Sequence, residues 1–237
     1  MTNYRVDTLE LGTFTTESGE TINNLKLRYE HVGYSGQPLV VVCHALTGNH
    51  LTYGTDEKHG WWREIIDGGY IPRHDYQFLT FNVIGSPFGS SSKLNDPNFP
   101  QHLTLRDIVK AIEKGIKALD FDKINILIGA SLGGMQAMEL LYNNQFQIDK
   151  AIILAATGKT SSYSRAFNEI ARQAIHLGGK EGLSIARQLG FLTYRSSKSY
   201  DQRFTPDEVV TYQQYQGNKF KKNFDLQCYL TLLDVLD

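Results

Sequence analysis

The sequence predicts a fold of the α/β class, with a mostly parallel sheet and crossover helices. Continuous apolar runs are typical of strands buried on both faces, and four occur at residues 39–43, 78–84, 124–128 and 150–155. Stretches with helical spacing of apolar residues lie between several of these runs, which indicates parallel strands joined by helices. A length of 237 residues is sufficient for one sizeable core.

The segments outside these runs predict two N-terminal strands, a long loop and the start of a helix. Two further strands are expected at Leu9–Thr15 and Leu25–Tyr29, on either side of a turn at Glu17–Glu20. The segment 85–100 is rich in Gly, Ser, Pro and Asn, which predicts a long loop. A helix is expected to begin at Thr104, which can cap it, with Asp107 close to the positive helix end.

The pattern changes after Ala156, because no further apolar run typical of a strand occurs. Residues 167–190 are helical in character and are interrupted at Gly178-Gly179, and residues 211–237 are mostly helical. We therefore predict an α/β core over residues 1–160 and a helical cap over residues 161–237, with its helices laid over the sheet.

Composition excludes several classes of function. The net charge of −1, from 24 basic and 25 acidic residues, gives no support for binding nucleic acid or an anionic membrane surface. Neither Cys43 nor Cys228 belongs to a CxxC pair, so no metal site is expected, and Cys43 is predicted to be a buried thiol. The N-terminus lacks a secretory signal pattern, and no window is apolar enough to span a membrane. A soluble cytoplasmic protein is the expectation.

The segment 126–136 (ILIGASLGGMQ) carries the strongest functional signal. It places Ser131 in a Gly-x-Ser-x-Gly pattern between an expected strand and an expected helix, which is the pattern of a nucleophile elbow. Glycines flank the serine because side chains there would collide in so tight a turn. A glycine-rich turn that only packs is the alternative, but the strand and helix on either side favour a catalytic Ser131.

Two backbone amides are expected to form an oxyanion hole beside Ser131. One is that of Leu132, at the N-terminus of the following helix. The other is that of Leu46, in the loop His44–Gly48 after the strand at 39–43. His44 is predicted to shape this loop rather than to act as a base, because a histidine base usually follows the serine and the acid in this motif class.

Several stretches together resemble the homoserine O-acetyltransferase family of α/β-hydrolase-fold enzymes. They cover the chain from about residue 9 to its end and include HALTG (44–48), FNVIGSPFGSS (81–91), GASLGGMQAMEL (129–140), GLSIARQLGFLTYRS (182–196) and KFKKNFDLQCYL (219–230). The resemblance implies transfer of an acetyl group from acetyl-CoA to the hydroxyl of L-homoserine, an early step toward methionine, through an acetylated Ser131. Acetyl-CoA is then a co-substrate, and no resident cofactor is expected.

The resemblance also implies substrate-binding residues. Arg187 matches the family arginine that holds the substrate carboxylate, and Tyr194 matches a tyrosine that lines the same pocket. From spacing alone, Arg187 is more simply a solvated helix residue and Tyr194 a core aromatic, and the family match reverses that preference. Arg172 is expected to be structural or secondary. Family members commonly form dimers through the cap, so a homodimer is an expectation, weakened by a cap shortened at residues 176–181.

No convincing acid and base accompany Ser131. His176 is the one histidine after it, and Asp149 precedes the strand at 150–155, so Asp149 is expected at the sheet edge opposite the serine. In the resembled family the acid and base follow two later strands, and this chain is expected to lack them, with very low turnover and an open sheet edge as consequences.

Three questions stay open at the level of sequence. An esterase would carry the same elbow with water as acceptor, and a catalytically inactive interaction module would explain the absent base. Acetyl and succinyl donors are not distinguished by these residues.

Overall fold

The computed structural model describes residues 3–237. Strands occupy β1 (Asn3–Glu10), β2 (Phe14–Thr15), β3 (Thr21–Ile22), β4 (Lys26–Gly33), β5 (Leu39–Cys43), β6 (Gln77–Phe81), β7 (Lys123–Ala130) and β8 (Gln147–Leu154). Helices occupy α1 (Arg63–Asp67), α2 (Leu105–Ala118), α3 (Leu132–Asn143), α4 (Ser162–Thr193), α5 (Ser197–Arg203), α6 (Pro206–Asn223) and α7 (Leu226–Leu236). No helix within residues 3–237 is long and apolar enough to cross a membrane.

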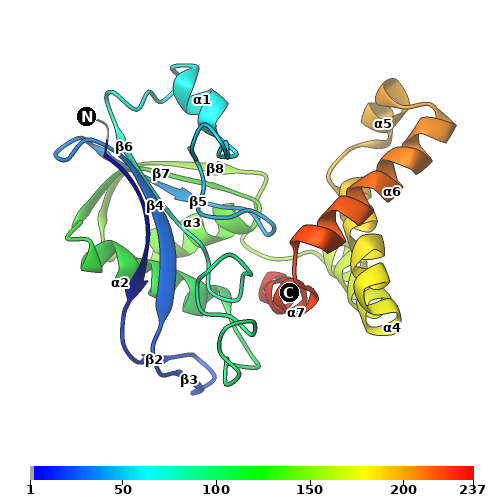
Figure 1. Ribbon diagram of the computed structural model, residues 1–237, viewed down its shortest axis with the longest axis horizontal. Coiled ribbons are helices and arrows are strands. Elements are labelled where there is room, and N and C mark those ends of the chain that lie inside the picture. Colours follow the sequence, from blue (N-terminus) through cyan, green and yellow to red (C-terminus); the bar gives the residue numbers. More distant parts are fainter. Residues whose placement is uncertain (1–2) are drawn as a thin grey trace. The chain divides into compact units, whose positions relative to one another are not determined.

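A six-stranded sheet in the order β1-β4-β6-β5-β7-β8 forms the centre of the first of two compact units (Figure 1). The pairs β6/β5, β5/β7 and β7/β8 are parallel, whereas β1/β4 and β4/β6 are antiparallel. Helices α2 and α3 pack against each other, and α3 also contacts β5, β7 and β8. The predicted α/β class with a mostly parallel sheet and crossover helices is therefore confirmed.

The burial predicted for the strand at residues 150–155 is wrong, although the strand exists as β8. Its residues are largely exposed, with Ile152 at 39%, Ile153 at 37% and Leu154 at 47%. Among the described residues β8 pairs only with β7, so it forms one edge of the sheet. Burial depends on the neighbours that a strand finds in the sheet, and an apolar run does not encode them.

The N-terminal strands also differ from their expected bounds. The run Leu9–Thr15 is divided between β1 and β2, because Gly12 adopts a left-handed conformation with φ +66° between them. The strands β2 and β3 form a small hairpin around the predicted turn, while β1 and β4 pair along their full length. The strand expected at 78–84 ends earlier, at Phe81, and α1 carries no sequence signal that predicted it.

The predicted start of α2 is confirmed in atomic detail. The Thr104 side chain accepts the Asp107 N–H, and the Asp107 carboxylate accepts the Thr104 N–H at 3.0 Å, which completes a capping box. The other oxygen of Asp107 accepts the Glu17 N–H at 2.8 Å. This buried carboxylate therefore joins the start of α2 to the β2–β3 hairpin.

The second unit is helical and covers Lys159–Leu233 with Asp237, whereas Asp234–Leu236 is assigned to the unit that ends at Gly158. The predicted boundary between residues 160 and 161 falls close to this division. Helix α4 is interrupted at Gly179, which has φ +55°, as the Gly178-Gly179 pair predicted. The helix expected over 211–237 is in fact two helices, α6 and α7, because Phe224 adopts an extended conformation that ends α6.

Candidate active site

Ser131 occupies a strained turn between β7 and α3. Its φ of +55° and ψ of −124° lie in a region that residues with a side chain rarely adopt. Two backbone hydrogen bonds hold it there: the Ser131 N–H donates to the Leu154 carbonyl at 3.0 Å, and the Ser131 carbonyl accepts the Met135 N–H at 3.1 Å. The side chain is exposed. This is the geometry that the elbow pattern predicted, with the hydroxyl presented at the carboxyl end of β7.

The flanking glycines are required by backbone contacts. A Cβ at Gly129 would lie 2.0 Å from the Gly133 carbonyl oxygen, and a Cβ at Gly133 would lie 2.0 Å from the Cys43 carbonyl oxygen. Atoms cannot approach so closely, so any side chain here would push α3 away from β7 and from the end of β5. The two glycines thereby let the beginning of α3 lie directly against the loop His44–Gly48, called the 44–48 loop below.

Two amides at this junction have no partner among residues 3–237. Neither the Leu46 N–H nor the Leu132 N–H has a hydrogen-bond acceptor there, and both leucine side chains are buried. The Leu132 amide is the first N–H of α3, at the helix end where the dipole favours negative charge. Amides of this kind can stabilise an oxyanion, so the geometry fits the predicted pair of donors.

His44 is fully buried, and both ring nitrogens are engaged. Its Nδ1 lies 2.8 Å from the Ala45 carbonyl oxygen, which requires a proton on Nδ1, and its Nε2 accepts the Val83 N–H at 3.1 Å. Burial lowers the pKa of His44 to about 4, so the ring is neutral at neutral pH. These contacts fix the 44–48 loop to the segment after β6, in agreement with the predicted shaping role.

A pH dependence of stability follows from this buried ring. With a pKa of about 4 in the folded protein and about 6.5 in the unfolded chain, His44 stabilises the fold fully above pH 6.5 and progressively less as the pH falls toward 4. The contribution of His44 to the slope of stability against pH is expected to be up to about 1.4 kcal/mol per pH unit. Denaturant unfolding between pH 4 and 7 measures it. His44→Gln should reduce the slope by about that amount and leave the part that buried His50 contributes, whereas exposed His176→Gln should not change the slope. Equal slopes in both variants would refute the assignment.

Gln136 is a residue of this junction that sequence reasoning missed. It is fully buried on α3, and its Nε2 donates to the His44 carbonyl at 3.3 Å, so it ties the helix after Ser131 to the 44–48 loop. The only sequence signal was a polar residue on an otherwise buried helix face. Cys43, at the end of β5, is buried as predicted, and burial raises the pKa of its thiol to about 12.

No acid and base for Ser131 emerge from residues 3–237, since none of them hydrogen-bonds to the Ser131 hydroxyl. Asp149 lies near the start of β8, where its carboxylate accepts the Lys123 ammonium at 2.9 Å and the Asn125 amide at 3.0 Å. These bonds hold the pKa of Asp149 below its usual range. His176 is exposed on α4 in the other unit. Asp149 is thus at the opposite end of β8 from Leu154, whose carbonyl accepts the Ser131 N–H, which agrees with its rejection as the acid. Within residues 3–237, no cluster of side chains could hold a metal ion.

The second unit brings Arg187 and Tyr194 to the same aromatic ring, that of Phe191. Arg187 is half-buried, and its guanidinium lies over the rings of Phe191 at 4.6 Å and Phe220 at 4.8 Å. The Phe191 and Tyr194 rings are 6.2 Å apart, and Tyr194 is 58% exposed. A solvated Arg187 and a core Tyr194, the simpler interpretations from spacing, are therefore both wrong. The spacing 187, 191, 194 is that of one helix face, a signal that could have linked these residues.

Tyr229 on α7 joins this cluster and was not predicted. Its ring is buried and packs edge-on against Phe220 at 5.6 Å. Burial raises the pKa of its hydroxyl, and the nearby charge of Arg187 opposes that rise. Arg172 forms ion pairs with Glu169 at 2.6 Å and with Asp237 at 2.8 Å, which agrees with the structural role expected for it.

Comparisons with known proteins agree with this geometry. A family description of the alpha/beta hydrolase fold matches residues 38–177. The chain is 32% identical over 274 residues to a homoserine O-succinyltransferase of Hahella chejuensis, covering 94% of this chain and 70% of that protein. It is 33% identical over 281 residues to a homoserine O-acetyltransferase of Citrifermentans bemidjiense, covering 99% of this chain and 76% of that protein.

A solved structure is more similar still. The crystal structure of a homoserine O-acetyltransferase from Staphylococcus aureus shares 85% sequence identity with a TM-score of 0.96, covering 99% of this chain and 72% of that one. The chain spans 54% to 76% of the lengths of the curated relatives it matches. The strained serine turn, the matched sequence and the shared fold lead to one conclusion: the chain belongs to the homoserine O-acetyltransferase family of α/β-hydrolase-fold enzymes.

Proposed function

We propose that this protein transfers an acetyl group from acetyl-CoA to the hydroxyl of L-homoserine, as a step of methionine biosynthesis in the cytoplasm. The observation that carries the proposal is the exposed hydroxyl of Ser131 in a strained turn beside two amides without acceptors. The name of the Staphylococcus aureus relative, at 85% identity, supports acetyl as the transferred group. Acetyl-CoA acts as a co-substrate in this proposal, and no resident cofactor takes part.

The reaction proceeds in two halves. The Ser131 oxygen attacks the thioester carbonyl, and the Leu46 and Leu132 amides hold the resulting oxyanion. The carbon–sulfur bond breaks, the proton of the serine hydroxyl passes to the departing CoA thiolate, and an acetyl ester remains on Ser131. The homoserine hydroxyl then attacks that ester through a second oxyanion in the same position. Its proton returns to Ser131 as O-acetylhomoserine leaves.

Homoserine is held in this proposal by Arg187, with Tyr194 beside it. A guanidinium can bind a carboxylate through two parallel hydrogen bonds, and the rings of Phe191 and Phe220 fix the plane of this one. An arginine packed against two aromatic side chains loses little further freedom when it binds a substrate. The half-buried guanidinium is therefore better suited to recognition than a solvated one would be.

Separate measurement of the two halves tests the proposed function. Intact mass after incubation with acetyl-CoA should show one acetyl group on Ser131, and homoserine should then remove it with formation of O-acetylhomoserine. Turnover by the 237-residue chain is expected to be low, because none of residues 3–237 hydrogen-bonds to the Ser131 hydroxyl. Release of acetate that homoserine does not affect would indicate an esterase instead. Succinyl-CoA, tested in parallel, should acylate Ser131 more slowly.

Arg187→Lys tests the acceptor half by itself. The lysine keeps the charge but loses the planar pair of donors, so the homoserine concentration for half-maximal deacylation should rise about 10- to 100-fold. Acetylation of Ser131 by acetyl-CoA should not change. Arg203→Lys is a matched control, since Arg203 also lies over an aromatic ring, that of Phe204, at 5.5 Å. An equal response of the two variants would remove Arg187 from the proposal.

A further inference from the structure

A pocket in the first unit carries positive charge that the proposed chemistry at Ser131 does not use. It has a volume of about 430 Å³, and its walls include Tyr4, Arg28, His50, Lys58 and Phe88. No aspartate or glutamate lines it among the described residues. We call it the Arg28 pocket. It combines two cationic side chains with two aromatic ones, so it has the chemistry to bind an anion attached to a ring system.

Arg28 is fixed in position by its surroundings. Gly89, with φ +104°, leaves room for the side chain, since a Cβ there would lie 2.5 Å from the Arg28 Cδ. The Arg28 Nε donates to the His50 Nε2 at 3.3 Å, and the Arg28 backbone N–H donates to the Ser90 Oγ at 3.0 Å. A guanidinium has five N–H donors, and the other four have no acceptor among residues 3–237.

His50 adds a second donor at the same place. It is 6% exposed, and its Nε2 accepts a hydrogen bond from Arg28, so the proton of the neutral ring is on Nδ1. Burial, together with the charges of Arg28 and Lys58, lowers the pKa of His50 to about 3, which keeps the ring neutral. The Nδ1 is buried and has no hydrogen-bond partner among residues 3–237. A buried donor left unpaired costs free energy, and a bound anion would satisfy it.

The nearest carboxylates do not neutralise the pocket. Asp7 is opposite Tyr29 in the β1–β4 pairing, whereas Arg28 is opposite Thr8, so Asp7 and Arg28 point to different faces of the sheet. Asp7 is moreover paired with Arg5 at 2.6 Å. Glu30 shares the face of Arg28, but its oxygens accept the Tyr53 and Gly54 amides at 2.8 Å each.

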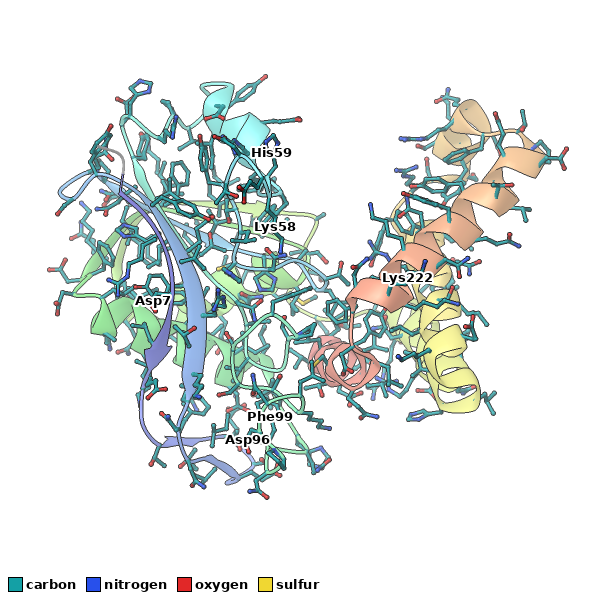
Figure 2. All side chains as sticks on the ribbon, in the orientation of Figure 1. Asp7, Lys58, His59, Asp96, Phe99 and Lys222 are labelled. Atoms are coloured by element: carbon teal, nitrogen blue, oxygen red, sulfur yellow. The ribbon has the colours of Figure 1, made fainter. Side chains whose placement is uncertain are left out.

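The Arg28 side of the pocket lies at the same edge of the sheet as Ser131. The Arg28 carbonyl accepts the Asn82 N–H at 2.8 Å, immediately after β6, and His50 follows the 44–48 loop by two residues. Lys58 lies further along the same connection, between β5 and α1 (Figure 2). The carboxyl ends of β5, β6 and β7 all meet at this edge, which is where ligands bind in parallel α/β sheets.

We propose that the Arg28 pocket binds the phosphate-bearing nucleotide end of coenzyme A while its thioester lies at Ser131. This inference rests on the proposed function, because that function supplies the anionic donor. Arg28, Lys58 and the His50 Nδ1 donate to phosphate oxygens, and Tyr4 and Phe88 contact the adenine ring. Guanidinium groups suit phosphate oxygens because their planar donors match them in pairs.

Calorimetric titration of the 237-residue chain with coenzyme A tests the site without requiring turnover. Arg28→Gln should weaken binding about 10- to 100-fold, and Lys58→Gln, at an exposed position, should weaken it several-fold without affecting folding. Arg5→Gln is the matched control, because it removes the same charge from the opposite face of the neighbouring strand, and it should change nothing. If Arg28→Gln and Arg5→Gln bind coenzyme A with equal affinity, the inference is overturned.

Two further ligands separate this inference from the proposed function. Acetyl-pantetheine lacks the nucleotide. Ser131 should therefore be acetylated by it at the same rate in Arg28→Gln as in the unaltered protein. Inorganic phosphate should compete with coenzyme A in the unaltered protein and not in Arg28→Gln. Acetylation from acetyl-CoA that is insensitive to Arg28→Gln would refute the pocket alone, whereas no acetylation from either donor would refute the proposed function.

Discussion

Ser131→Ala is expected to abolish acetylation of the protein by acetyl-CoA and by an activated acetyl ester. The alanine keeps the backbone of the elbow but removes the only oxygen that can carry the acetyl group there. Where acid and base are both present, loss of one member of such a triad typically costs about 10⁴- to 10⁶-fold in rate. Covalent labelling is therefore the more decisive readout, since it is lost entirely whatever the turnover of the intact chain.

Intact mass and peptide mapping of the acetylated protein measure this effect. Ser35→Ala is the control, because Ser35 is an exposed serine of a turn in the same unit. The melting temperature of Ser131→Ala should stay close to that of the unaltered protein, since alanine at φ +55° is strained as serine is. An acetyl group that persists in Ser131→Ala would place the nucleophile elsewhere.

Gly133→Ala is expected to have the largest effect on stability. Its Cβ would lie 2.0 Å from the Cys43 carbonyl oxygen and 2.9 Å from that of His44. Both carbonyl oxygens belong to the backbone, and Cys43 is the last residue of the buried strand β5. They therefore cannot rotate away as a flexible side chain could. Overpacking of this kind typically costs 1–3 kcal/mol, and we expect a loss of about 3 kcal/mol or more.

Denaturant unfolding measures the loss, with Gly158→Ala as the control. Gly158 is exposed, and a Cβ there meets no atom within 4 Å, so its substitution should change stability by less than about 0.5 kcal/mol. Gly133→Ala should also slow acetylation of Ser131, because moving α3 separates the Leu132 amide from that of Leu46. Equal stability of the two variants would mean that α3 is free to move relative to β5.

Local signals were sufficient for much of the first unit. The apolar run of β5 has the predicted bounds, the Thr104–Asp107 capping box is present, and α4 is interrupted at its predicted glycine pair. The elbow was predictable for the same reason, because a strained serine between a strand and a helix requires glycines two positions away on either side. Each of these features depends on residues within a few positions of one another.

Tertiary structure decided the features that join distant segments. The exposure of β8 depends on which strands pair with it, and the contacts of Gln136 with His44 and of Tyr229 with Phe220 and Arg187 depend on packing between elements. The Arg28 pocket assembles side chains from β1, β4 and the segments after β5 and β6. The sequence by itself determined the nucleophile turn and the family, because both are written in contiguous motifs. Only the fold determined which buried donors are left without a partner, because burial and hydrogen bonding are properties of the assembled chain.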